Sequence, residues 1–232
     1  MTSATSTLVE YFIAEQGRLS DGALGLLAAR AALAGHARWR ARPAYSAWHA
    51  RVMTKVVLVA TAEELARIHA STETLALSPD GEEVPANAEP MLLVLPPQPK
   101  DVMIDLVGHL RLAPKERGPT PEPVAGPALV LAAAGDLGMH GGKLAAQCAH
   151  AALLANQSYG RHSGWGDWSS AGRPMALRRL NSGPLAELAA RFPGGAVHDA
   201  GHTQVPAGAL TVVPVPPWTS ASERLIDDGE PW

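Results

Sequence analysis

The feature that most constrains the fold is an internal repeat. Sliding the 232-residue sequence by 120 positions aligns residues 8–81 with residues 128–201 without a gap, and Trp48 then meets Trp168. Alanine-rich helices also match by chance, so the argument depends on the preserved order of apolar runs, helical stretches and turns. A repeat of this length predicts two copies of one structural unit rather than one large domain.

A proline-rich segment separates the two copies. Residues 114–127, PKERGPTPEPVAGP, contain five prolines and little that can pack. Such a composition is typical of an extended, semi-rigid linker. We therefore predict two domains, residues 1–113 and residues 128–232.

Strand-like and helix-like stretches alternate in the same order within each copy. The first copy predicts strands over 8–14, 53–60, 73–79 and 90–96, and helices over 22–38, 61–70 and 100–110. The second predicts strands over 128–134, 174–180, 195–200 and 209–215, and helices over 142–157 and 182–192. An irregular segment with tryptophans follows each first helix. The fold class is thus α/β, with two tandem three-layer units, each built on a mixed four-stranded sheet.

The end of the chain departs from this pattern. Residues 220–232, SASERLIDDGEPW, show no clear final helix. We expect the second copy to use the first copy's helix, residues 101–111, in its place. An internal pseudo-dimer of the two copies is one hypothesis that follows, and a homodimer of the whole chain is another.

Composition excludes several classes of protein. The formal net charge of −3 argues against a nonspecific nucleic-acid binder, although residues 128–217 carry a local excess of two positive charges. One cysteine excludes an internal disulfide framework. Neither a signal peptide nor an apolar run of roughly 20 residues is recognisable, so we expect a cytoplasmic protein that does not enter a membrane.

The second copy carries a glycine-rich turn that leads directly into an alanine-rich helix. Lys143 stands at the helix start, where the helix dipole disfavours a cation unless an anion is to be bound. Lys143, Gln147 and His150 share one stripe of this helix, and the neighbouring stripe, with Leu144 and Cys148, is expected to be buried. A solvated lysine at a helix start is the simpler alternative. Cys148 is expected to act as a small hydrophobic residue and not as a nucleophile.

A polar loop over residues 198–204 is the second candidate for chemistry. Asp199 is suited to general-base work, Thr203 to orienting a water molecule, and His202 to donating a hydrogen bond. The alternative is an Asx turn in which the Asp199 carboxylate accepts from a nearby backbone N–H. Both Lys143 and this loop follow predicted strand ends, where α/β sheets bind ligands.

The first copy lacks this polar set. Ala23, Leu27, Arg30 and Pro79 stand where the second copy has Lys143, Gln147, His150 and Asp199. Residues needed only for the fold would be expected in both copies. The comparison favours a functional second copy and a non-catalytic first copy.

Two separated motifs carry a family resemblance. DLGMHGGKLAAQCAHA and, later, DAGHTQVPAG make residues 127–217 resemble the type-2 peptidyl-tRNA hydrolases of archaea and eukaryotes, with residues 8–113 as a degenerate copy. The resemblance implies hydrolysis of the ester that joins a peptide to the terminal ribose of tRNA, without a metal or other cofactor. It implies Lys143, Asp199 and Thr203 as the active-site set, supported by Gln147, His150 and Gln204.

This sequence also departs from the family pattern. Gly141 and His202 replace a lysine and an arginine, which removes two expected phosphate contacts. Gly142, His202, Arg161, Arg173 and Arg178 remain candidates for binding the tRNA, although a solvated face explains such arginines equally well. The aromatic residues of 159–174 either stack on a terminal base or cover the core. A non-catalytic tRNA-end or peptide-binding module, and a hydrolase of another ester or amide, are the alternative functions.

Overall fold

The computed structural model describes residues 7–51, 53–85, 88–116, 124, 126–201 and 204–232. The chain forms two compact units, one of Met1–Arg18 with Ala34–Pro114 and the other of Leu19–Leu33 with Lys115–Trp232. The division into domains at the proline-rich linker stays a prediction about which parts fold independently. Within the described residues, no helix is long and apolar enough to cross a membrane.

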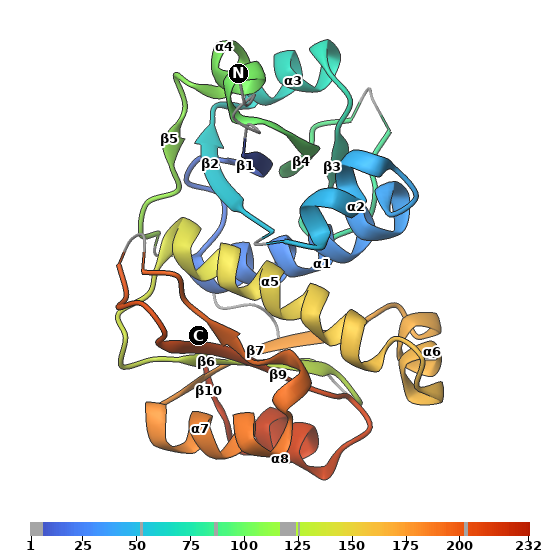
Figure 1. Cartoon of the computed structure of the whole chain (residues 1–232), viewed down its shortest axis with the longest axis vertical. Helices are drawn as coiled ribbons and strands as arrows, with labels where there is room; N and C mark the ends of the chain where they lie inside the picture. The colour runs from blue at the N-terminus through green and yellow to red at the C-terminus, as the bar shows by residue number, and fades with distance from the viewer. Residues whose placement is uncertain (1–6, 52, 86–87, 117–123, 125, 202–203) are drawn as a thin grey trace, which may run out of the picture. The chain divides into compact units, whose positions relative to one another are not determined.

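Apart from the short η1 of the second repeat, the two repeats have the same order of elements (Figure 1). The first consists of β1 (Leu8–Glu15), α1 (Asp21–Trp39), α2 (Pro43–His49), β2 (Lys55–Ala60), α3 (Ala62–Ser71), β3 (Leu75–Leu77), β4 (Leu92–Pro99), α4 (Lys100–Val107) and β5 (Arg111–Leu112). The second consists of β6 (Leu129–Ala134), α5 (Gly141–Tyr159), α6 (Ser163–Ser170), β7 (Met175–Leu180), α7 (Ser182–Arg191), the short η1 (Pro193–Gly195), β8 (Val197–His198), β9 (Leu210–Val215), α8 (Ser220–Asp228) and β10 (Glu230–Pro231). The predicted strands and main helices are confirmed to within a few residues.

Over the described residues, each sheet has five strands, so the expectation of four was wrong. The strand orders are β3-β4-β1-β2-β5 and β10-β7-β6-β9-β8, which are the same topology. The central pairs β1–β2 and β6–β7 are parallel, and the other pairs are antiparallel. The additional strands β5 and β10 are two residues long, too short to show an alternating pattern in the sequence.

Two further expectations about helices were wrong. The tryptophan-bearing segments form the short helices α2 and α6. The second repeat also has its own final helix, α8, and so does not need residues 101–111. Thr219 caps α8 by accepting a hydrogen bond from the Ser222 N–H, and the apolar side chains of Leu225 and Ile226 pack on the core of this unit. Charged neighbours hid that apolar pair in the sequence.

Strand register places a one-residue insertion in the glycine-rich turn. Glu10 pairs with Lys55, and the equivalent pair in the second sheet is Leu129 with Met175. The first strands are therefore related by 119 positions, whereas α1 and α5 start 120 positions apart. The gapless alignment was wrong by one residue at the first strand, because the loop before α5 is longer than the loop before α1.

The second unit has three layers. Helix α5 covers one face of its sheet, and α7 and α8 cover the other (Figure 1). Its central strand β6 is buried along its whole length, as expected for a strand covered on both faces. Because β6 and β9 are antiparallel neighbours, the segment that follows β6 and the segment that precedes β9 lie at the same end of these two strands.

The first unit contains a buried ion pair at positions where the second unit has the apolar residues Leu129 and Met175. Lys55 Nζ lies 3.8 Å from Glu10 Oε2, and neither side chain has solvent exposure. Lys55 also lies over the ring of Trp48 and donates to the Met53 carbonyl. Within the described part of the chain, neither carboxylate oxygen of Glu10 has a hydrogen-bond partner. Burial raises the pKa of Glu10 from 4.5 to about 7 and lowers the pKa of Lys55 from 10.5 to about 8, and their mutual attraction opposes both changes.

Candidate active site

The turn before α5 is shaped by glycine. Gly138 and Gly141 have φ angles of +66° and +51°, in the left-handed region that other residues enter at a cost. Gly141 is the first residue of the 19-residue helix α5. The predicted buried stripe is confirmed, since Leu144 and Cys148 are fully buried. Burial raises the pKa of the Cys148 thiol, which agrees with its expected role as a small hydrophobic residue.

The loop after β8 holds Asp199 through its backbone. The Asp199 N–H donates to the Ala209 carbonyl at 2.9 Å, and the Gly208 N–H donates to the Asp199 carbonyl at 2.7 Å. Its carboxylate Oδ1 accepts from the Gly201 N–H at 2.7 Å, which is the predicted Asx turn. Gly201 has a φ of +79°, and a Cβ there would lie 2.6 Å from the Cβ of Ala207. Only glycine fits this position without displacing the loop.

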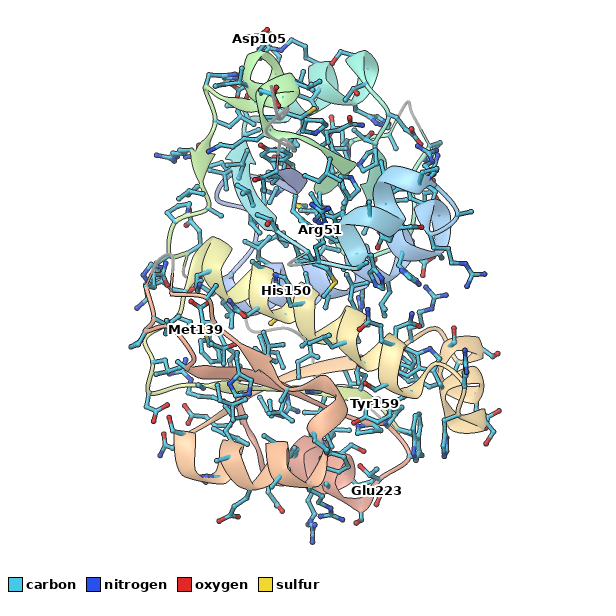
Figure 2. The ribbon with its side chains drawn as sticks, viewed as in Figure 1. Arg51, Asp105, Met139, His150, Tyr159 and Glu223 are labelled. Atoms are coloured by element: carbon cyan, nitrogen blue, oxygen red, sulfur yellow. The ribbon has the colours of Figure 1, made fainter. Side chains whose placement is uncertain are left out.

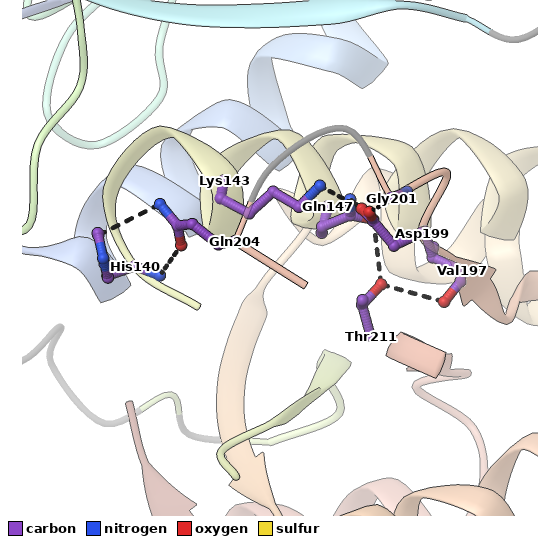
Figure 3. Close-up of polar contacts among 8 residues, drawn as sticks. All are labelled: His140, Lys143, Gln147, Val197, Asp199, Gly201, Gln204 and Thr211. Carbon is purple, nitrogen blue, oxygen red and sulfur yellow. Dashed lines mark hydrogen bonds and ion pairs between the residues drawn. The ribbon is translucent and has the colours of Figure 1, made fainter. Parts of the chain in front are cut away.

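The structure brings Lys143 and Asp199 together. Lys143 Nζ forms an ion pair with Asp199 Oδ2, and the Gln147 Nε2 donates to the same oxygen at 2.6 Å (Figure 3). The side chain of Asp199 is 2% exposed and that of Lys143 is 12% exposed. The Asx turn therefore coexists with the ion pair, because each uses a different carboxylate oxygen. Lys143 is the more exposed member of the pair.

Thr211 is a neighbour of the candidate site that the sequence analysis missed. Its Oγ1 lies 3.0 Å from Gln147 Oε1 and 3.0 Å from the Val197 carbonyl, and its hydroxyl hydrogen serves one of these acceptors at a time. With Oε1 facing this hydroxyl, the amide of Gln147 points its donor at Asp199. Thr211 is fully buried on β9, and the signal in the sequence was one hydroxyl within an otherwise apolar strand.

Gln204 joins the loop to the turn before α5. Its Oε1 accepts from the His140 N–H at 3.1 Å, and its Nε2 lies 3.5 Å from His140 Nδ1 (Figure 3). His140 is the N-cap residue of α5, and its side chain makes no capping hydrogen bond. Gln204 therefore links the two segments that carry Lys143 and Asp199.

The remaining residues of α5 are spread along the helix. Figure 2 labels Met139 before its start, His150 midway and Tyr159 at its end. Gly142 is partly exposed in the first turn and His150 is partly buried. The substrate-binding roles of both residues stay predictions.

The tryptophans of α6 cover the core. Trp165 and Trp168 are buried with their ring centroids 4.5 Å apart, and the Trp168 Nε1 donates to the Pro174 carbonyl at 2.8 Å. Of the two interpretations of this segment, the structure favours the packing role for both residues.

The three candidate arginines lie in different environments. Arg161 is exposed after α5, and the Arg173 Nε donates to Ser169 Oγ at 3.1 Å. Arg178 is buried, and its guanidinium donates to the carbonyls of Leu225 at 2.9 Å and Ile226 at 3.1 Å. These carbonyls belong to the last turn of α8, so Arg178 caps that helix. This structural role does not favour the predicted contact with tRNA.

His202 and Thr203 lie outside the described residues. Among the residues that are described, no group of three or more His, Cys, Asp or Glu side chains is placed to hold a metal ion. The described site thus consists of an ammonium, a carboxylate and an amide at the start of one helix and the end of one strand. Such a site is suited to polarising a carbonyl and orienting water.

Comparisons with known proteins agree on the second repeat. The family model described as "Peptidyl-tRNA hydrolase PTH2" matches residues 128–226. A peptidyl-tRNA hydrolase of Haloquadratum walsbyi is 39% identical over 93 residues, covering 38% of this chain and 82% of the relative. Those of Saccharolobus islandicus (strain L.S.2.15) and Saccharolobus solfataricus are 33% and 32% identical over 113 residues, each covering 43% of this chain and 90% of the relative.

The matches to these relatives cover 82% to 90% of each relative, and the family-model match includes both segments that form the ion pair. The fold and the site define a class of α/β units that have a lysine in the first turn of the main helix, paired with an aspartate from a loop. The chain belongs to the PTH2 family of peptidyl-tRNA hydrolases through its second repeat.

Proposed function

We propose that this chain hydrolyses the ester between a peptide, or an N-blocked amino acid, and the terminal ribose of tRNA. The relatives carry the name of this activity. The observation that carries the proposal is the meeting of Lys143 and Gln147 on α5 with Asp199 on the β8–β9 loop, inside the matched segment.

The chemistry follows from the way the Asp199 carboxylate is held. Three donors fix it: the Lys143 ammonium, the Gln147 amide and the Gly201 N–H. Lys143 has three N–H bonds, so pairing with Asp199 leaves donors for the carbonyl oxygen of the substrate. A preorganised cation at that oxygen stabilises the oxyanion of the tetrahedral intermediate.

Asp199 orients the attacking water and accepts its proton. The water oxygen bonds to the carbonyl carbon, and the bond between that carbon and the ribose oxygen then breaks. The proton passes to the ribose oxygen, so the products are the free carboxylic acid and tRNA. Thr203 is proposed to orient this water, as the family resemblance implies.

Basic residues of the second repeat that are exposed or partly exposed are proposed to contact the tRNA. Arg161 and Arg173 are the candidates among the described residues, and Gly142 and His202 are the further candidates from the sequence. Phosphate contacts of this kind weaken as salt concentration rises. Binding to tRNA should therefore fall with salt, and more steeply for the wild type than for Arg161→Ala.

The proposal is tested by release of the amino acid from N-acetyl-aminoacyl-tRNA. Lys143→Ala and Asp199→Asn are each expected to lower kcat by about 10² to 10³, the effect of removing one oxyanion donor or its support. Lys100→Ala is the matched control, because Lys100 is an exposed lysine in the first turn of α4. Wild-type turnover that survives both site substitutions would contradict the assignment, and tRNA binding without turnover would indicate a binding module.

The assembly and location of the protein are part of the proposal. The matching topology of the two repeats supports an internal pseudo-dimer, in which the chain is a monomer in solution. Sedimentation of the full chain as a dimer would favour the homodimer instead. We place the reaction in the cytoplasm, where a hydrolase of peptidyl-tRNA meets its substrate.

A further inference from the structure

The N-terminus of α5 needs a hydrogen-bond acceptor that its own flanking residues do not supply. The first N–H groups of an α-helix have no partner within the helix. His140 stands at the N-cap position, and its side chain makes no capping hydrogen bond. The φ of +51° at Gly141 further departs from regular helical geometry. Lys143 follows two residues later, so the position of its backbone depends on how this end is held.

Asp21 supplies the missing acceptor. Its Oδ1 accepts from the Gly141 N–H at 3.0 Å and from the Glu116 N–H at 2.9 Å. The Asp21 N–H also donates to the Glu116 carbonyl at 3.3 Å. Asp21 is 8% exposed, so its carboxylate is largely withdrawn from water. Hydrogen bonds to a buried carboxylate are stronger than those between neutral groups, so Asp21 stabilises the first turn of α5.

A second packing contact on the same helix lies one turn further along α1 and two turns further along α5. A Cβ built on Gly25 would lie 3.2 Å from the Cys148 Sγ and 3.3 Å from the Leu177 Cδ2. Gly25 therefore allows α1 to approach α5 closely at this point. Residues Leu19–Leu33 belong to the same compact unit as α5, although by sequence they lie in the first repeat.

We infer that Asp21 is a positioning residue for Lys143, an inference that rests on the proposed function. The carboxylate complements the positive end of the α5 dipole and fixes the backbone from which Lys143 reaches Asp199. The Gly141 N–H is already satisfied by this bond. The substrate's anionic oxygen is therefore met by the Lys143 ammonium and not by that amide.

This inference gives the degenerate first repeat a role in catalysis. It has no lysine, glutamine or aspartate at the positions of the proposed site, yet Asp21 from its sequence caps the helix that presents the reactive ammonium. The rival explanation is that Asp21 occupies a site meant for a substrate phosphate and so inhibits binding. The rival explanation predicts a lower KM when the carboxylate is removed, whereas the positioning role predicts a lower kcat with little change in KM.

The test compares kcat and KM of Asp21→Ala and Asp21→Asn with the wild type, using N-acetyl-aminoacyl-tRNA. We expect Asp21→Ala to lower kcat about tenfold or more, because a small displacement of a catalytic group is costly, and to leave KM within about twofold. Asp21→Asn keeps an oxygen for both N–H groups and should restore most of the rate. Asp101→Ala, which removes an aspartate from the first turn of α4, is the control.

Amide hydrogen exchange of residues 141–144 gives a readout that does not need activity. Asp21→Ala should speed exchange in this segment, and Asp21→Asn should leave it close to the wild type. Unchanged kcat and unchanged exchange in Asp21→Ala would overturn the inference, and so would a lower KM with undiminished kcat. An inactive wild type would refute the proposed function instead, and the exchange data would still decide whether Asp21 holds α5.

Discussion

Replacement of the buried Glu10–Lys55 pair by the residues of the second sheet should stabilise the first unit. Leu129 and Met175 occupy the equivalent positions and are fully buried. The double variant Glu10→Leu with Lys55→Met therefore uses side chains that the same topology already accommodates. It also removes two carboxylate oxygens that have no hydrogen-bond partner within the described residues.

The magnitude follows from the pKa values of the pair. The change from 4.5 to about 7 at Glu10 corresponds to about 3 kcal/mol against the ionised carboxylate, and the change from 10.5 to about 8 at Lys55 corresponds to a similar amount. The two costs are coupled and do not simply add. Replacing such a pair by apolar residues raises the free energy of unfolding by about 1–4 kcal/mol in comparable cases, whereas removing one partner lowers it by about 3 kcal/mol or more.

The gain in stability of the double variant over the wild type should depend on pH. The folded chain holds a proton on Glu10 that the unfolded chain loses between pH 4.5 and about 7, so the contribution of Glu10 to stability falls as pH rises through that window. Lys55 is deprotonated in the folded chain above about pH 8 but in the unfolded chain only above 10.5, so its contribution rises with pH there. The advantage of the double variant is thus largest between pH 7 and 8.

Urea unfolding and hydrogen exchange of peptides in β1 and β2 measure this advantage in the first unit. Both methods are applied at pH 5, 7.5 and 10 to the wild type, the double variant and Glu10→Leu alone. A double variant less stable than the wild type at pH 7.5 would refute the reasoning. An advantage that is the same at all three pH values would refute it as well.

Three further predictions concern the second unit. Gly201→Ala should lower kcat about 10²-fold, because the new Cβ displaces the loop that carries Asp199. Gly208→Ala is its control, since Gly208 has the same φ of +79° but nothing within 4 Å of the new Cβ. This control should lower the free energy of unfolding by only about 1 kcal/mol. Gln147→Leu should lower kcat about tenfold or more with little change in KM, because Asp199 loses a buried donor; a kcat equal to the wild type would exclude a supporting role. Arg178→Ala should speed hydrogen exchange in α8 and leave the affinity for tRNA unchanged, and a weaker affinity with an intact α8 would restore the predicted RNA contact.

Much of the fold was accessible from the sequence. The apolar runs of β1 and β6, the alanine-rich α1 and α5 and the repeat between them predicted two α/β units, because strand and helix periodicity is a local property of the chain. The short strands β5 and β10 were missed because two residues carry no period. Helix α8 was missed because its stability comes from the Thr219 cap, from packing and from Arg178 on a neighbouring strand.

The candidate site was predicted in part. Lys143 and Asp199 were expected to meet, because both follow strand ends, and they form an ion pair. Thr211 was missed because a buried threonine in a strand is ordinary until its partner is known. Arg178 was predicted to bind tRNA because sequence alone does not distinguish an exposed arginine from one that caps a helix.

The sequence by itself determined the elements, their repeat and the chemical types at the site, since these depend on residues that are close together in the chain. The tertiary structure decided which groups form hydrogen bonds and ion pairs with one another. Gln147 and Asp199 are 52 residues apart, Gln147 and Thr211 are 64 apart, and Asp21 and Gly141 are 120 apart. Contacts over such separations form only when the sheet brings its strand ends together and the helices pack, so no local pattern encodes them.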